Sequence, residues 1–163
     1  MNGAIIADKV YRNGVLIGRD LPVTLPTVTH KTAEHTAMGT TNLPIPGLID
    51  PMEPSITYKG YAKELALLCT PEAADFEIRF VQDKKSSDGS SIAVGCRAYM
   101  RAVPTVLPGG ELAMGEILEM EVPLGCTRYQ LFVDGYEVCL IDQIKCIERI
   151  NGKDYAQSIN SLL

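Results

Sequence analysis

Residues 127–154, TRYQLFVDGYEVCLIDQIKCIERINGKD, predict a strand, a tight turn and a second strand. Apolar side chains alternate along the chain up to Asp134-Gly135 and resume after this pair. An Asp-Gly pair between two such runs is the strongest local signal of a β-hairpin, because both central positions of a type I′ turn need a positive φ. The stretch contains none of the short motifs of an active site. Residues 127–154 are therefore predicted to have a structural role and no catalytic one.

The same kind of signal recurs earlier in the chain. Asn13-Gly14 separates two short apolar runs and predicts a second hairpin with the same turn chemistry. Residues 76–82 and 92–103 alternate with a period of two on either side of a polar turn, which predicts a third hairpin. The chain is therefore expected to consist mainly of strands.

One helix interrupts these strands, at residues 61–69. Its apolar residues Leu65, Leu68 and Cys69 fall on one side at i, i+3, i+4 spacing, and Pro71 lies just beyond its end. The helix is thus predicted to pack one face against the strands.

Two further stretches predict irregular strands. Residues 21–31 are rich in Val and Thr but contain prolines that cannot donate ladder hydrogen bonds, so any strand there should be an edge strand or an interrupted one. Residues 115–133 could form one long strand bent near Pro123 and Gly125.

The composition is that of a globular protein and excludes several functions. The chain has 163 residues, 46% hydrophobic and 21% charged, which suits one folded domain. Its net charge of −5 and lack of a Lys/Arg cluster argue against tight binding of nucleic acid, which needs several cationic contacts to phosphate. We find no secretory signal and no apolar run of roughly 20 residues, so we expect a soluble, non-exported chain. Its 5 irregularly spaced cysteines predict reduced, buried thiols.

The segment 35–54, called the arm below, is a long excursion with four prolines. Loops of this length are uncommon in compact domains and are usually functional or held by a partner. The arm is also too apolar for a solvated linker. We predict that it docks on a neighbouring subunit; the alternative is that it folds back over its own domain. The apolar residues predicted to make the contact are Leu43, Ile45, Leu48, Ile49 and Met52.

The sequence predicts no catalytic residue, no metal ligand and no cofactor. Glu119 and Glu121 share one face of a predicted strand, but no His or Asp lies near them in the sequence, so a solvated face is the simpler interpretation. His30 and His35 are five positions apart, a spacing that places two residues on one face of neither a helix nor a strand. Nucleophile and phosphate-binding motifs are missing.

Several motifs, taken in order along the chain, resemble the major tail tube proteins of contractile-tailed bacteriophages of the P2 type (the FII family), a pattern shared by the tubes of R-type bacteriocins. Each motif is short, but together their order and spacing are specific. They are VTLP at 23–26, KT at 31–32 followed by Glu34, PIP at 44–46, IDPME at 49–53, YQL at 129–131, VDG at 133–135 and INGKD at 150–154.

This resemblance implies a mainly β fold, an antiparallel β-sandwich or barrel with one flanking α-helix and a long extended loop between subunits. It implies one tail tube domain over residues 1–163, with the arm at 35–54 and a C-terminal tail at 155–163. Members of the family form hexameric rings that stack into the inner tube of a contractile tail, the conduit for genome delivery during ejection. We therefore expect a structural virion protein and no enzyme.

The resemblance also implies the partners. These are further copies of the chain in stacked rings, the tail sheath protein, the tape measure protein in the lumen, the baseplate and the tail terminator. DNA would pass through without specific binding, and no membrane binding is expected of this chain. The protein would reside in the virion tail, and in the host cytoplasm during assembly. A free subunit is expected to keep its arm disordered until neighbours arrive.

A channel that conducts DNA should not grip it, because each cationic contact with phosphate would slow the passage. We therefore predict that polar strand faces line the lumen, with arginines paired to carboxylates across strands. The residues predicted to face the lumen are Glu119, Glu121, Glu77, Arg79, Arg97 and Arg101.

Alternative functions remain open from the sequence. The chain could be the tube protein of a type VI secretion-like system, an R-type bacteriocin tube, or a tail terminator that caps the tube. An alternative of a different class is a monomeric binding module with a β-sandwich fold. The apolar arm argues against this last alternative, since a large exposed apolar patch generally marks an interaction site.

Overall fold

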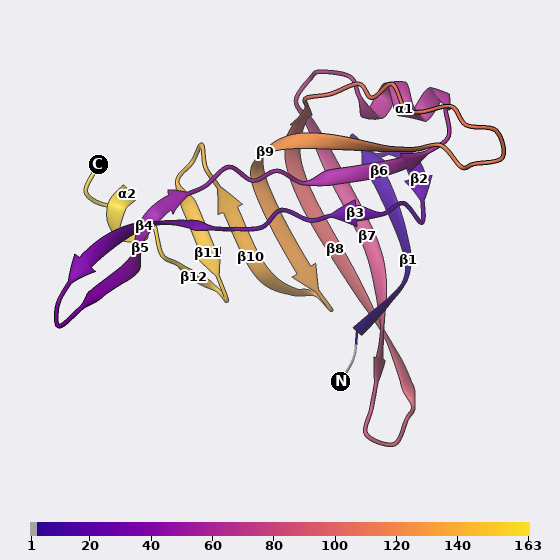
Figure 1. The fold of residues 1–163 in the computed structure, drawn as a ribbon. Helices are drawn as coiled ribbons and strands as arrows, with labels where there is room; N and C mark the ends of the chain where they lie inside the picture. Colours follow the sequence, from indigo (N-terminus) through magenta and orange to yellow (C-terminus); the bar gives the residue numbers. More distant parts are fainter. Residues whose placement is uncertain (1–2) are drawn as a thin grey trace.

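The computed structural model describes residues 3–163, which form two packed layers of antiparallel strands and a separate hairpin (Figure 1). The large sheet runs in the order β12, β11, β10, β9, β8, β7, β1, β2. Its strands are β1 (Gly3–Arg12), β2 (Val15–Arg19), β7 (Ala74–Lys85), β8 (Ser91–Pro104), β9 (Glu119–Val133), β10 (Tyr136–Asp142), β11 (Ile147–Ile150) and β12 (Lys153–Asp154). The expectation of a mainly β, antiparallel fold is confirmed.

The second layer is small and crosses in front of the large sheet (Figure 1). It consists of β3 (Val23–Thr24), β6 (Ser55–Lys59) and the first residues of β9. Strand β3 is only two residues long, as expected for the proline-interrupted stretch 21–31. Strand β9 pairs with β6 as far as Pro123 and with β8 from Leu124 onward, so it belongs to both layers. This confirms the predicted bend near Pro123 and Gly125, although the strand begins at Glu119.

The core lies between the two layers. Phe76, Ile78 and Met100 point into it from the large sheet, and Ile56 and Val122 point into it from the second layer; each is at most 2% exposed. Side chains on successive residues of a strand point to opposite faces, so each layer keeps one face for the core and one for the surface. The two outer faces therefore point in opposite directions.

The tight turns follow the sequence closely. Asp134 and Gly135 have φ values of 51° and 76°, and Asn13 and Gly14 have 47° and 81°, so both pairs have the positive φ values that a type I′ turn needs. Both hairpins, β1–β2 and β9–β10, are confirmed. The third, β7–β8, is also confirmed and turns at residues 86–90.

Helix α1 (Lys63–Leu68) lies within the predicted range 61–69 and buries Leu65 and Leu68 as expected. The guanidinium of Arg12, which is 8% exposed, donates hydrogen bonds to the carbonyl oxygens of Leu67, Thr70 and Glu72 just where the helix ends. A cation at this place satisfies carbonyls that have no partner within the helix.

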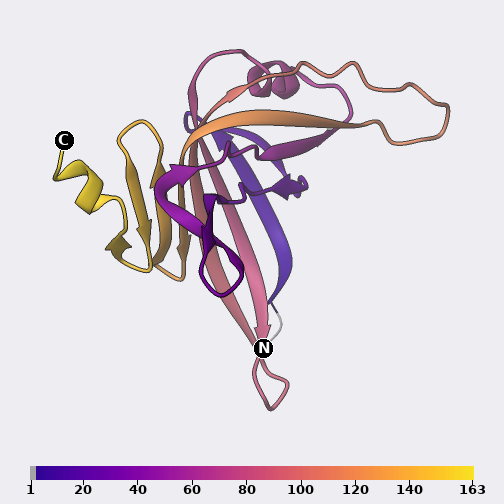
Figure 2. The ribbon, with the colours of Figure 1, turned by 60° about the vertical axis from the view of Figure 1, so that its left-hand side comes forward.

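Two expectations need correction. A second helix, α2 (Gln157–Asn160), follows β12 inside the predicted C-terminal tail; a single turn of four residues is too short to produce a helical pattern in the sequence. The arm is a hairpin of β4 (His30–Thr36) and β5 (Thr40–Ile49), with an irregularity between His30 and Thr32, and begins five residues before the predicted start at 35 (Figure 2). Prolines 44 and 46 fit in β5 because both strands of a two-stranded sheet are edges.

Within residues 3–163, no helix has the length and apolar character needed to cross a membrane.

Candidate functional surfaces

The outer face of the large sheet is a broad polar surface, built from the side chains that point away from the core. Rows of residues face one another across β1, β7, β8 and β9: Lys9 is opposite Arg79, Arg79 opposite Arg97, and Arg97 opposite Phe132. We call this surface the sheet face; its residues are Lys9, Tyr11, Asp75, Glu77, Arg79, Arg97, Tyr99, Arg101, Arg128, Gln130 and Phe132.

Several arginines of the sheet face are paired with carboxylates. Arg79 Nε lies 2.7 Å from Glu77 Oε1, and Arg101 Nη1 lies 3.1 Å from Asp75 Oδ1. The hydrogen bond to Glu77 raises the pKa of Arg79. Exposed pairs of this kind contribute little to stability, so their effect is mainly to balance the local charge.

The sheet face is hollowed over β1, β7 and β8. The hollow has a volume of about 860 Å³ and is lined by both charged and aromatic side chains. The guanidinium of Arg79 lies 4.7 Å from the ring centre of Tyr11, and the rings of Tyr99 and Phe132 meet edge to face at 5.9 Å. Both contacts are favourable interactions that hold these side chains together within the surface.

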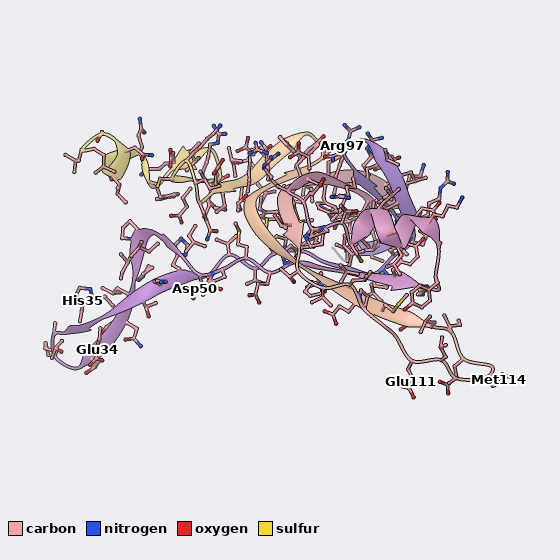
Figure 3. The ribbon with its side chains drawn as sticks, turned by 90° about the horizontal axis from the view of Figure 1, so that it is seen from above. Glu34, His35, Asp50, Arg97, Glu111 and Met114 are labelled. Atoms are coloured by element: carbon pink, nitrogen blue, oxygen red, sulfur yellow. The ribbon has the colours of Figure 1, made fainter. Side chains whose placement is uncertain are left out.

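The structure separates the six residues predicted to form one lumen surface. Glu77, Arg79, Arg97 and Arg101 lie together on the sheet face. Glu119 and Glu121 lie in the part of β9 that pairs with β6, and they point outward from the second layer while Met120 is buried beneath them. Figure 3 shows Arg97 on the opposite side of the molecule from this layer. One lumen surface cannot include both groups, because the core lies between them.

The arm exposes apolar side chains in the single subunit. Leu43 and Leu48 are 47% and 49% exposed, and Ile45 and Ile49 are half-buried. Met52 is only 1% exposed and forms a β-bridge with Cys126 inside its own subunit. It was predicted to contact a neighbour, but it belongs to the core of its own domain, as the alternative of folding back proposed.

The base of the arm is fastened to β11 by Glu148, a residue that the sequence analysis did not single out. This side chain is 3% exposed, and its two carboxylate oxygens contact His30 Nε2 and the backbone N–H of Gly47. His30 and Glu148 are 118 positions apart, so no local pattern could have connected them.

A second apolar projection was also missed. Residues 105–118 form a loop that extends beyond the sandwich, away from the arm (Figure 3). Leu112 and Met114 at its tip are 84% and 101% exposed. The hydroxyl of Tyr61 donates hydrogen bonds to the carbonyl oxygens of Pro108 and Gly109, which fixes the base of the loop beside α1. We call this segment the projecting loop.

The expectation that the thiols are buried holds for Cys69, Cys96 and Cys126, but Cys139 is half-buried and Cys146 is exposed. Burial raises the pKa of Cys126 to about 11 and also raises the pKa values of Cys69 and Cys139. A thiol with a raised pKa has little thiolate at neutral pH and is a weak nucleophile. Within residues 3–163, no group of three or more His, Cys, Asp and Glu side chains is arranged to hold a metal ion.

The fold is that of subunits of contractile injection systems. The chain is similar to a chain of the sheath-tube complex of the extracellular contractile injection system PVC in its extended state, with 15% identity, a TM-score of 0.53, and coverage of 77% of this chain and 87% of the other. It is equally similar to a chain of the PVC sheath/tube terminator structure, with 14% identity, a TM-score of 0.52, and coverage of 77% and 92%.

The sequence gives a narrower assignment. Residues 4–163 match the phage tail tube protein FII family, and the chain belongs to this family. The tail tube protein of Escherichia phage P2 is 36% identical over 78 residues, a match that spans 47% of this chain and 44% of that protein. This is a family of structural proteins and not of enzymes, and phage tail tube proteins are components of the virion.

Proposed function

We propose that the chain forms hexameric rings that stack into the inner tube of a contractile phage tail and conduct the genome during ejection. The observation that carries the proposal is the family match over residues 4–163. The single subunit also exposes two apolar projections, the arm and the projecting loop, at different ends of the molecule. Large exposed apolar patches are typical of interaction sites.

In this assembly the arm contacts a neighbouring subunit. Leu43 and Leu48 make the contact from exposed positions, and Ile45 and Ile49 support them from half-buried ones. The further partners follow from the same proposal: the sheath protein outside the tube, the tape measure protein inside it, and the baseplate and terminator at its ends. The PVC structures, which contain sheath, tube and terminator, support the sheath protein and the terminator as partners.

The sheet face lines the lumen. None of the projections crosses it, whereas the second layer carries the projecting loop and leads into the arm (Figure 1). The hollow over β1, β7 and β8 makes part of this surface concave. Its paired arginines limit the attraction between wall and phosphate. Glu119 and Glu121 then face away from the channel.

Electron microscopy of the purified protein tests the assembly. Stacked rings or tubes are expected, and the double substitution Leu43→Glu and Leu48→Glu should abolish them while the circular dichroism spectrum stays that of a folded β protein. A charge in place of a docked leucine cannot be accommodated without desolvation. A stable wild-type monomer at all concentrations would contradict the proposal.

Thiol labelling tests the lumen. Arg97→Cys and Glu119→Cys, each placed in a Cys146→Ser background to remove the exposed native thiol, are compared in assembled tubes. A small maleimide should reach Cys at position 97 through the open ends, while a bulky polyethylene glycol maleimide should not. If the bulky reagent reaches position 97, the sheet face does not line the lumen.

The tail terminator is a second candidate, favoured by the similarity to the PVC terminator structure. The fold does not separate the two, because the TM-scores of 0.53 and 0.52 are nearly equal. A terminator would form single rings that do not extend, and the same microscopy distinguishes these from tubes.

A further inference from the structure

We propose that Glu148 is a latch that fixes the direction of the arm within one subunit before any neighbour is present. The proposal rests on the proposed function, because the direction of the arm matters only if the arm docks on a neighbouring subunit. It concerns contacts inside a single chain, however, and can be tested without assembly.

The latch acts at a break in the hairpin of the arm. Between His30 and Thr32 strand β4 advances two residues, while their partners on β5, Ile49 and Pro44, are five residues apart. The extra residues leave the backbone N–H of Gly47 outside the ladder. Gly47 is partly buried, and an N–H shielded from water is costly without an acceptor, so a partner from elsewhere is favourable here.

Glu148 provides that partner and holds the other strand as well. Its Oε2 accepts the N–H of Gly47 at 3.3 Å, and its Oε1 contacts Nε2 of His30. One carboxylate therefore bridges β4 and β5 at the point where the arm leaves the domain. Because Glu148 is 3% exposed and His30 is 31% exposed, the contact is shielded from water on the side of the domain and open on the side of the arm.

The backbone at Glu148 is also held in position. The backbone N–H of Glu148 donates to Asp154 Oδ1 at 3.3 Å, and the same oxygen accepts the N–H of Ala156 at 2.9 Å. Asp154 thus connects β11 to the start of α2. Lys31 and Asp142 are the other charged groups that line the small hollow beside Glu148.

Helix α2 contacts the base of the arm at Gly47. Gly47 has a φ of 77°, and a Cβ added there would lie 2.7 Å from Cδ1 of Ile159, so the backbone of the arm passes directly against this side chain. Gln143 Nε2 donates to the carbonyl oxygen of Ile49 at 3.3 Å. The base of the arm is therefore held by β11, the β10–β11 turn and α2 together (Figure 2).

A latched arm is ready for docking. Ordering a free segment at the moment of binding lowers affinity, and a segment already held in its bound direction avoids this cost. On this proposal the base of the arm is ordered in the free subunit, in contrast to the sequence-based expectation of an arm that stays disordered until neighbours arrive.

Hydrogen exchange of the monomeric fraction, taken from a sizing column, tests the latch. We compare the wild type with Glu148→Gln, with His30→Ala, and with Glu34→Gln, which removes a charge from an exposed position of the arm. Glu148→Gln and His30→Ala should each speed the exchange of β4 and β5 amides at least tenfold, with exchange in β7 and β8 unchanged. Glu34→Gln should match the wild type.

Two results would overturn the latch. One is exchange in the arm of both variants within twofold of the wild type. The other is an equal increase in β7 and β8 in both variants, because Glu148 would then support the whole fold and not the arm. A wild type that never forms tubes but shows the expected exchange would overturn the proposed function and leave the latch standing.

Discussion

Replacing Arg12 by Met should destabilise the domain more than any other single arginine substitution on the large sheet. Arg12 comes from the end of β1, and its guanidinium reaches three carbonyl oxygens at the end of α1. Two of these contacts are long, at 3.3 and 3.4 Å, and Nε has no hydrogen-bond partner among residues 3–163. The contribution of the Arg12 side chain to the stability of the domain is therefore smaller than three hydrogen bonds would suggest.

The magnitude follows from the one short contact and the carbonyls left behind. A hydrogen bond from a charged donor contributes about 1.5–3 kcal/mol, and a buried carbonyl without a partner costs about 1–3 kcal/mol. Because the two long hydrogen bonds, to Thr70 and Glu72, contribute little, we expect Arg12→Met to lower the free energy of unfolding by about 2–4 kcal/mol. For a domain of this size, that corresponds to a fall in Tm of about 10 °C.

Urea denaturation followed by circular dichroism measures the effect. Arg97→Met is the matched control, because Arg97 is exposed and its loss should change stability by about 0.5 kcal/mol or less. Arg12→Lys should fall between the two, since one ammonium cannot span three carbonyls. If Arg12→Met and Arg97→Met differ by less than about 0.5 kcal/mol, then Arg12 does not cap α1 and the reasoning is refuted.

Three further outcomes are expected. The pKa of Cys126 is raised to about 11 from an ordinary 9, so the thiol of the unfolded chain ionises first and stability should fall between pH 9 and 11, by about 1 kcal/mol at pH 10 relative to pH 7. Cys126→Ala should lose this part of the pH dependence. Gly135→Ala should cost about 1–2 kcal/mol in thermal unfolding because its φ is 76°, whereas Gly95→Ala, where a Cβ meets nothing within 4 Å, should be neutral or slightly stabilising. Iodoacetamide should label Cys146 before the other thiols, as mass spectrometry of the peptides would show; equal labelling of Cys126 would contradict its burial.

The hairpins and α1 could be predicted because their signals are local. Asp134-Gly135 and Asn13-Gly14 specify their turns through backbone conformations that neighbouring residues cannot override. In β7, alternation correctly places Ile78 toward the core and Arg79 toward solvent. In each case the residues that decide the structure are within a few positions of one another.

The surfaces could not be predicted, because they depend on how distant strands meet. Alternation shows which side chains of a strand share a face, but not which way that face points relative to another strand. Strand β9 illustrates the problem: Glu121 and Gln130 lie on one strand, yet the strand passes from the second layer into the large sheet between them. The bulge at Thr127, where Arg101 faces Arg128 but Ala102 faces Cys126, further changes the register.

Because β9 belongs to both layers, its glutamates and the arginines of the large sheet lie on different faces of the subunit. Residues 105–126 contain four glutamates and no Lys or Arg, and all of them lie on the projecting loop or the second layer. Four of the 20 acidic side chains therefore lie on the side that carries the apolar projections. The sheet face, as defined above, holds five cations, Lys9, Arg79, Arg97, Arg101 and Arg128, and two carboxylates, Asp75 and Glu77, and its hollow is also lined by Arg19, Asp8, Asp20 and Asp134. If the sheet face lines the lumen, DNA is not repelled by an acidic wall. The passage of DNA then depends on the stability of the ion pairs Arg79–Glu77 and Arg101–Asp75. A guanidinium that is paired with a carboxylate is less available to bind phosphate.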